Sequence, residues 1–176
     1  MTSARAAERR FVLTFLAVAG GMSLAYFYPW CPGSLVDTAY SAYLRAYAKV
    51  AGTAIGWFDP TAHVVGQEIV GRFGLRIIHD CDAMETNILY VAAVLAFSAT
   101  WRQRAAGLVA GLVAIGVANV VRVCALYLVG LHWPPAFDTA HREIAPIAIV
   151  TVALSAFVGW AGWASRGTPA PGHAAA

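Results

Sequence analysis

The chain has 176 residues, of which 60% are hydrophobic and only 12% are charged, and its mean hydropathy is +0.64. This composition excludes an ordinary water-soluble domain and indicates a membrane protein. The formal charge of +3 does not point to nucleic acid, because the basic residues are scattered and stand near the ends of apolar runs. We therefore expect an all-α polytopic membrane protein that contacts the lipid bilayer and binds no nucleic acid.

The first predicted transmembrane helix covers residues 11–28 and follows three arginines within residues 5–10. The same arrangement is typical of a cleaved signal peptide, with a passable cleavage site at residues 23–25. The aromatic residues between 26 and 30 favour a retained helix instead, because Tyr and Trp gather at the membrane interface. We expect the helix to be retained.

Residues 34–58 have the pattern of an amphipathic helix that lies at the membrane surface. One side is a polar stripe with i, i+4 spacing, formed by Asp37, Ser41, Arg45 and Lys49. The other side carries Tyr40, Tyr43, Tyr47, Val50 and Ala54. As a membrane span this helix would place Arg45 and Lys49 near the bilayer centre, at a cost of about 2.5–3.5 kcal/mol each. We therefore predict an interfacial helix.

A short β-hairpin is predicted over residues 64–78, because two β-prone runs flank a turn at residues 71–74. The hairpin leads directly into His79, Asp80 and Cys81.

Three further apolar runs complete the predicted helices, at residues 86–101, 105–131 and 142–163. Each approaches or exceeds the roughly 20 residues that a helix needs to cross a hydrocarbon core. With the first helix they make about four transmembrane helices in a single membrane-embedded domain, residues 1–166. We expect the remaining residues, 167–176, to form a disordered tail.

Alternate crossing of the membrane places three polar residues on the same face. Cys81 precedes the second predicted span, Arg122 lies in the last third of the third, and His141 precedes the fourth. Basic residues flank both ends of the spans, so the positive-inside rule does not decide which face this is.

Lines of small residues connect these three residues to the helix faces. Steps of three and four from Cys81 meet Glu85, Ile88, Ala92, Ala96 and Ala99. The line that leads to Arg122 is Gly107, Gly111, Ala114 and Ala118. From His141 the same steps meet Ala145, Ala148, Thr151, Ser155, Gly159 and Gly162. Small residues mark close approach of membrane helices, so we expect Cys81, Arg122 and His141 to converge inside the bundle. A single line of small residues also arises by chance in an Ala-rich and Gly-rich chain. The prediction therefore depends on the alignment of all three lines with Cys81, Arg122 and His141.

Cys81 is the cysteine whose surroundings favour chemistry. It stands at a predicted helix start, where the helix dipole stabilises a thiolate, while Asp80 and Asp82 oppose its ionisation. A nearby cation is needed, and Arg122 or a protonated His141 would supply it. An arginine within a membrane helix is functional by default, with a structural ion pair as the alternative.

The sequence shows no spacing typical of a metal centre. The cysteines, which form no CxxC pair, are Cys31, Cys81 and Cys124. The histidines without ligand spacing are His63, His79, His132 and His173. A weak site made by His132, His141 and Asp138 stays open. We expect no cofactor and no bound metal ion.

The order of these motifs resembles the exosortase/archaeosortase membrane transpeptidases, and the short chain resembles the compact exosortase H type. The resemblance covers residues 60–160. It consists of a β-prone segment before Cys81, the Asn-x-x-Arg motif Asn119-Val120-Val121-Arg122, and a histidine, His141, that opens the next helix. Many members have a small pair with glycine soon after the cysteine, whereas this chain has Asp82-Ala83-Met84.

The resemblance implies that Cys81, Arg122 and His141 are the catalytic residues. Cys81 would attack the scissile carbonyl and form a thioacyl enzyme, His141 would act as general base and then general acid, and Arg122 would stabilise the oxyanion. Asn119 would orient Arg122. Glu85 and Asp138 are possible supporting residues that would pair with Arg122 or His141.

The resemblance also implies the partner and the location. Its members are thought to cleave a C-terminal sorting signal, consisting of a short motif, a transmembrane helix and a basic cluster, and to transfer the protein to a surface acceptor. They act on the outer face of the bacterial inner membrane, which implies that the interfacial helix at residues 34–58 is extracytoplasmic. The motif recognised, the acceptor nucleophile and the oligomeric state are not predicted by the sequence.

Two other classes stay open. A membrane thiol-disulfide oxidoreductase would use Cys31 and Cys81, although the usual vicinal pair is missing. A non-catalytic scaffold or transporter subunit would use Arg122 only for packing.

Overall fold

The computed structural model describes residues 2–77 and 81–166, and it is helical apart from one small sheet. The predicted tail at 167–176, together with His79 and Asp80, lies outside the described residues. In chain order the elements are α1 (Thr2–Phe27), α2 (Leu35–Ile55), β1 (His63–Val65), β2 (Glu68–Val70), β3 (Leu75–Arg76), α3 (Met84–Ala96), α4 (Trp101–His132), η2 (Pro134–Ala136), α5 (Phe137–Thr139), η3 (Ala140–Ile144) and α6 (Ala145–Arg166).

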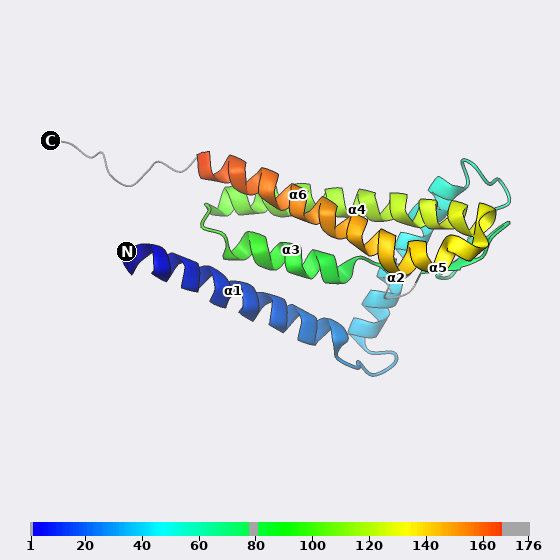
Figure 1. Ribbon diagram of the computed structural model, residues 1–176. Helices are drawn as coiled ribbons and strands as arrows, with labels where there is room; N and C mark the ends of the chain where they lie inside the picture. The colour runs from blue at the N-terminus through cyan, green and yellow to red at the C-terminus, as the bar shows by residue number, and fades with distance from the viewer. Residues whose placement is uncertain (1, 78–80, 167–176) are drawn as a thin grey trace.

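Four helices form an elongated bundle, with α3 in contact with α1, α4 and α6. α1 begins at the end of the bundle where α6 ends, and the sheet lies at the opposite end (Figure 1). Among the described residues, three helical segments are long and apolar enough to cross a membrane: Arg5–Phe27, Trp101–His132 and Pro134–Arg166. α3 has 13 residues, or about 20 Å, which is less than the ~30 Å hydrocarbon core. The chain is therefore an all-α polytopic membrane protein in which one of the four expected spans is short.

The connection between α3 and α4 explains why α3 ends earlier than the predicted residue 101. Phe97 has extended backbone dihedrals and ends the helix. Thr100 then caps α4: its side chain accepts a hydrogen bond from the Gln103 backbone, and the Gln103 side chain bonds back to Thr100 in a capping box. Residues 97–100 thus form the connection between α3 and α4, and Trp101 is the first residue of α4.

α3, α4 and α6 pack through small residues on α4 that face large residues on its neighbours. A Cβ at Gly111 would lie within the ring of Tyr90, and one at Gly107 would overlap Trp160. The Tyr90 hydroxyl donates to the Gly107 carbonyl at 2.8 Å. The predicted line of small residues on α4 is therefore a close-packing face.

The predicted packing face of α6 is wrong beyond its first residue. Ala145 is buried as expected, but the other residues expected on that face are exposed: Ala148, Thr151, Ser155, Gly159 and Gly162. The buried residues are Ala145, Ile149, Ala153, Trp160 and Ala164. Bulky Trp160 fills the hollow left by Gly107 of α4, so the residues of α6 that pack against α4 do not need to be small.

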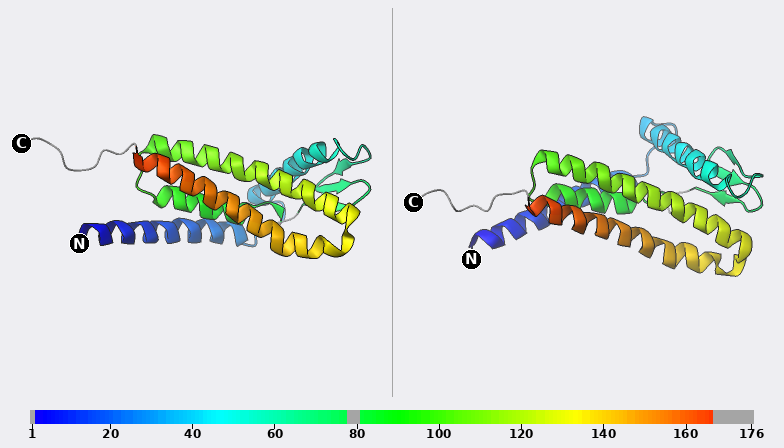
Figure 2. Two further views of the ribbon diagram at one scale, coloured as in Figure 1. Left: turned by 45° about the horizontal axis from the view of Figure 1, so that its top comes forward. Right: turned by 90° about the horizontal axis from the view of Figure 1, so that it is seen from above.

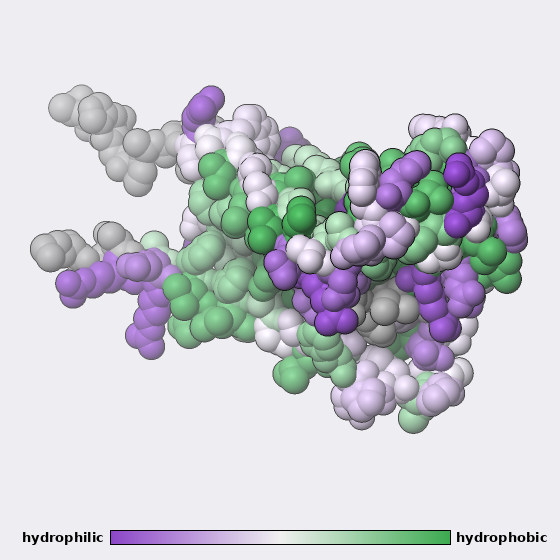
Figure 3. Space-filling view, turned by 45° about the vertical axis from the view of Figure 1, so that its right-hand side comes forward, coloured by the Kyte–Doolittle hydropathy of each residue, from purple (hydrophilic) through white to green (hydrophobic). Residues whose placement is uncertain are grey.

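A cap made of α2 and the sheet covers the end of the bundle that is opposite the start of α1. α2 lies at an angle to the long helices and beside the strands (Figure 2). Arg45 and Lys49 of its polar stripe are exposed, while Leu44, Ala48 and Ile55 are buried against the sheet and α4. Figure 3 shows hydrophilic residues at the two ends of the molecule and a mostly hydrophobic band between them. α2 is not among the three described segments that are long and apolar enough to cross a membrane.

The sheet has three antiparallel strands in the order β1-β2-β3, one more than the expected hairpin. β1 and β2 are joined by the two residues Gly66 and Gln67. Gly66 has a φ of 65°, a left-handed conformation that tight hairpin turns need and that glycine adopts without strain. The turn at 71–74 connects β2 to β3, as predicted, and β1 is the additional strand.

Candidate active site

Cys81 lies in a short segment between the sheet and α3, and its side chain is buried, with 4% exposure. It was expected at a helix start, but α3 begins three residues later, at Met84. The first backbone N–H of the helix, that of Met84, donates to the Asp82 carboxylate at 2.8 Å. Because the helix field falls off within the first turn, Asp82 rather than the Cys81 thiol occupies the end of the helix dipole.

Asp82 is a buried carboxylate that the tyrosines of α1 and α2 surround. Tyr26 donates to its Oδ2 at 2.9 Å, and Tyr40 donates to the same atom at 2.5 Å. Tyr43 donates to the Asp82 carbonyl at 3.2 Å. Burial and the hydrogen bond to Asp82 raise the pKa of Tyr40 far above its ordinary value, so its hydroxyl stays protonated and remains a donor. These contacts fix the residue that follows the nucleophile candidate.

Ala83 has a φ of 56°, in the left-handed region that a residue with a Cβ occupies only at a cost of about 1–2 kcal/mol. The hydrogen bonds on either side of it, at Asp82 and at Met84, hold the backbone there. The turn aims the chain from Cys81 into α3.

Asn119 and Arg122 reach the same segment from α4. Asn119 is fully buried, and its Nδ2 donates to the Cys81 carbonyl at 2.9 Å. Arg122 is 9% exposed, and its Nη1 contacts Asn119 Oδ1 at 3.4 Å. The predicted Asn-x-x-Arg motif therefore places the amide between the guanidinium and the backbone of Cys81.

His141 lies in η3, a π-helical turn, rather than at the start of a regular helix as expected. Such turns widen the helix by one residue and often occur at functional sites. The His141 ring stacks on the ring of Phe137, with 5.8 Å between centroids and 8° between planes. Phe137 thereby determines the orientation of the imidazole.

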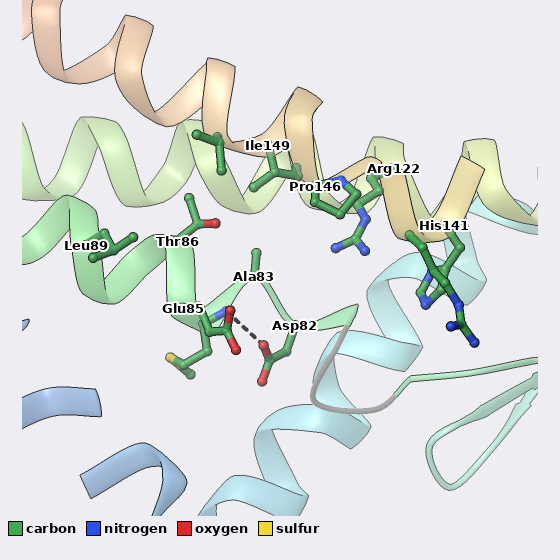
Figure 4. A pocket seen from close by; sticks show the side chains of 12 residues that line it. Asp82, Ala83, Glu85, Thr86, Leu89, Arg122, His141, Pro146 and Ile149 are labelled. Atoms are coloured by element: carbon green, nitrogen blue, oxygen red, sulfur yellow. Dashed lines mark hydrogen bonds between the residues drawn. The ribbon is translucent and has the colours of Figure 1, made fainter. Parts of the chain in front are cut away.

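Two adjoining pockets meet at His141. The first has a volume of about 380 Å³, and its lining includes Asp82, Ala83, Glu85, Arg122, His141 and Ile149. Figure 4 shows Arg122 and His141 pointing into the space beside Asp82 and Ala83. The second has a volume of about 220 Å³ and includes Cys81 and His141. The structure thus brings together the three residues expected to converge, but around two pockets that share the histidine rather than in a single one.

The two possible supporting acids differ in position. Glu85 lines the first pocket together with Arg122. Asp138 does not pair with Arg122 or His141 as expected. Instead its Oδ1 forms an ion pair with Nε of Arg142, four residues later, at 3.0 Å, and both side chains are exposed. One turn of helix satisfies Asp138 locally, which removes it from the site.

Other candidate chemistries have less support from the geometry. Within residues 2–77 and 81–166, no three His, Cys, Asp or Glu side chains cluster as a metal site would require, which leaves the weak site of His132, His141 and Asp138 without support. No disulfide joins Cys31, which is exposed, to Cys81, which is buried.

Comparison with known protein families shows to which family the chain belongs. A family model described as transmembrane exosortase (Exosortase_EpsH) matches residues 9–159. The chain belongs to the transmembrane exosortase family. Membership in this family supports a membrane transpeptidase-type function that depends on cysteine. No match was found among curated proteins or among solved structures.

Two groups of residues in this exosortase escaped sequence reasoning. One is the set of tyrosines that hold Asp82, although the tyrosine spacing on the interfacial helix was visible. The other comprises Phe73, Phe137, Asp59 and Tyr127, which join the sheet to α4 beside Cys81. Asp59 comes directly before Pro60 in the turn that follows α2, and a lone acid before a proline shortly after a helix is the signal that was available.

Proposed function

We propose that this exosortase is a membrane cysteine transpeptidase that cleaves C-terminal sorting signals of exported proteins and transfers them to a surface acceptor. The observation that carries the proposal is the arrangement around Asn119. Its amide bonds to the Cys81 carbonyl and to Arg122, while His141 lines both the pocket of Cys81 and the pocket of Arg122. Nucleophile, cation and general base therefore adjoin one another.

The reaction proceeds in two halves through the thiol of Cys81. The thiolate bonds to the scissile carbonyl carbon, and as the carbon–nitrogen bond breaks, His141 gives the departing amine a proton. The product is a thioester on Cys81. The acceptor nucleophile then attacks this thioester, His141 takes its proton, and the thiolate leaves.

Arg122 stabilises the negative charge that develops on the carbonyl oxygen. Its side chain is 9% exposed, and Asn119 restrains its Nη1. A fixed cation shielded from water stabilises an oxyanion more strongly than one in bulk solvent. Removing one such donor commonly lowers the rate about 10²–10³-fold.

The substrate's transmembrane helix would approach through the first pocket. Leu89, Ile149 and Val150 line that pocket between α3 and α6, so apolar side chains continue from it along the membrane-embedded helices. The basic cluster of the signal would then lie at the end of the bundle where Arg5 and Arg166 stand, which is cytoplasmic in this proposal. The site then faces the outer side of the inner membrane.

The test is cleavage of a reporter that carries a matching sorting signal. Proteins of the same genome that end in a shared short motif, an apolar helix and Arg-rich residues supply the signal. Cys81→Ala is expected to abolish cleavage with little change in thermal stability, while Cys31→Ser and Cys124→Ala, which remove the other thiols, retain it. A reporter peptide bound as a thioester to Cys81 in the wild type would identify the intermediate.

The opposite result is equally clear. If Cys81→Ala processes the reporter at the wild-type rate, then the thiol is not the nucleophile and a non-catalytic role becomes the better explanation. A disulfide between Cys31 and Cys81, detected by mass spectrometry of non-reduced protein, would favour the oxidoreductase instead.

A further inference from the structure

The second pocket, beside Cys81, has an apolar lining that the roles of the catalytic residues do not require. It encloses about 220 Å³ between the sheet and the segment that follows α4, and its lining is Phe73, Gly74, Leu75, Arg76, Cys81, Phe137 and His141. Two aromatic rings and a leucine thus surround the space next to the thiol. Outside the two catalytic side chains, Arg76 is the charged residue of the described lining, and it is 68% exposed and forms an ion pair with Glu68. It therefore compensates a charged guest little for the hydration lost in the pocket.

The aromatic wall is held rigidly. Phe73 lies directly over Gly130 of α4, where an added Cβ would come within 2.3 Å of its ring. The ring also meets Tyr127 edge-on at 6.0 Å, and the Phe73 N–H donates to the Tyr127 hydroxyl at 3.3 Å. Phe73 therefore cannot turn away to enlarge the pocket without breaking several contacts.

Asp59 anchors this wall to the rest of the cap. It is 1% exposed, and its Oδ2 accepts hydrogen bonds from the Tyr127 hydroxyl at 2.5 Å and from the Arg72 N–H at 3.2 Å. Its Oδ1 accepts from the hydroxyl and the backbone of Thr61. One carboxylate thus connects the end of α2, the turn before Phe73, and α4.

Phe137 closes the wall on the side of the histidine. Its ring centroid is 5.4 Å from that of Phe73 and 5.8 Å from that of His141, to which it is nearly parallel. The same ring therefore orients the imidazole and bounds the pocket. A side chain that fills the pocket would touch both the base and the wall.

The position of the pocket indicates which part of a substrate it receives. This step rests on the proposed function. A transmembrane helix that enters between α3 and α6 places the departing side of the scissile bond in the first pocket. The acyl side must then extend toward the sheet, where the second pocket lies against Cys81.

We propose that this pocket is a specificity subsite for the residue on the acyl side of the scissile bond, and that it selects an uncharged, apolar side chain. An enclosed apolar cavity of about 150 Å³ accommodates benzene, so a pocket of about 220 Å³ admits side chains up to the size of a phenyl ring. Phe73 and Phe137 are the residues that determine this specificity.

The experiment measures alkylation of Cys81 in the purified full-length protein in lipid nanodiscs. The probes are N-acetyl aminoacyl chloromethyl ketones with Val, Phe, Glu or Lys side chains, and iodoacetamide serves as a probe with no side chain. The thiolate bonds to the methylene carbon of each ketone as the carbon–chlorine bond breaks and chloride leaves. The product is a thioether, which mass spectrometry localises to Cys81. The Val and Phe probes are expected to react at least about tenfold faster than the Glu and Lys probes.

Variants connect the selectivity to the wall. Phe137→Trp narrows the pocket and is expected to slow the Phe probe relative to the Val probe. Phe137→Ala widens the pocket and is expected to reduce the difference in rate between the Phe and Val probes. The control is Phe97→Ala, an aromatic truncation in the cluster with Phe157 and Trp160 at the far end of α3, which leaves the ratios unchanged.

The results separate this proposal from the proposed function. Equal rates for all four ketones, or ratios that Phe137 variants leave unchanged, would overturn the subsite while Cys81 remains the nucleophile. If iodoacetamide labels Cys81 but none of the ketones does, the subsite is also overturned. If the thiol reacts with no probe at all, the proposed function fails with it.

Discussion

Replacing Gly111 by alanine tests the packing between α3 and α4 that holds the candidate site together. An added Cβ at this position would lie 1.9 Å from Tyr90 Cζ and 2.0 Å from its hydroxyl. Tyr90 is 4% exposed, and its hydroxyl bonds to the Gly107 carbonyl at 2.8 Å. The ring must therefore move, and in moving it must give up that hydrogen bond.

The expected cost follows from these two effects. Overpacking of a filled interior costs about 1–3 kcal/mol, and a buried hydroxyl that loses its partner costs about 1–3 kcal/mol more. The better helix propensity of alanine offsets up to about 1 kcal/mol of this destabilisation. The net destabilisation is on the order of 2–4 kcal/mol, which corresponds to a thermal midpoint lower by roughly 10 °C.

Gly116 provides the matched control on the same helix, because a Cβ there has nothing within 4 Å. Thermal unfolding in detergent, followed by circular dichroism, should show a large loss for Gly111→Ala and no loss for Gly116→Ala. Repeating Gly111→Ala in a Tyr90→Ala background should remove most of its cost, since the obstructing ring is gone. Equal midpoints for the two glycine variants, or an undiminished cost in the Tyr90→Ala background, would refute the reasoning.

Two further predictions concern buried carboxylates. Hydrogen bonds from Thr61 and Tyr127 hold the pKa of Asp59 well below its ordinary 3.8, so its contribution to stability is present above that value and is lost as the pH falls below it toward the folded pKa. The thermal midpoint of the wild type should thus fall on acidification below about pH 4 more steeply than that of Asp59→Asn, and parallel slopes would contradict this. Tyr40→Phe removes one donor from buried Asp82 and should destabilise the protein by about 1–3 kcal/mol in a thermal melt. Tyr28→Phe, which alters an exposed ring, should be neutral, and an equal effect of both changes would show that the Asp82 contact is unimportant.

The sequence was sufficient to predict that the protein is an all-α membrane protein, because a hydrocarbon core requires long apolar runs and leaves few ways to satisfy the backbone. Alternate crossing then predicted that Cys81, Arg122 and His141 share one face. The Asn-x-x-Arg spacing predicted that Asn119 stands one helical turn from Arg122, and in the structure the two side chains are in contact. Each of these inferences depends only on the local geometry of a helix and on the thickness of a membrane.

Tertiary structure decided the features that depend on contacts between distant segments. Tyr26 and Asp82 are 56 residues apart, and Asp59 and Tyr127 are 68 apart, so no local period could have paired them. The packing face of α6 also depended on its partner, because Trp160 of α6 packs into the hollow at Gly107 of α4 and is buried, whereas Gly159 is exposed. Helical periodicity shows that a face exists, but the shape of the neighbouring helix determines which residues fill it. For the same reason, the division of the candidate site into two pockets joined at His141 became visible only when the sheet and α4 were in place.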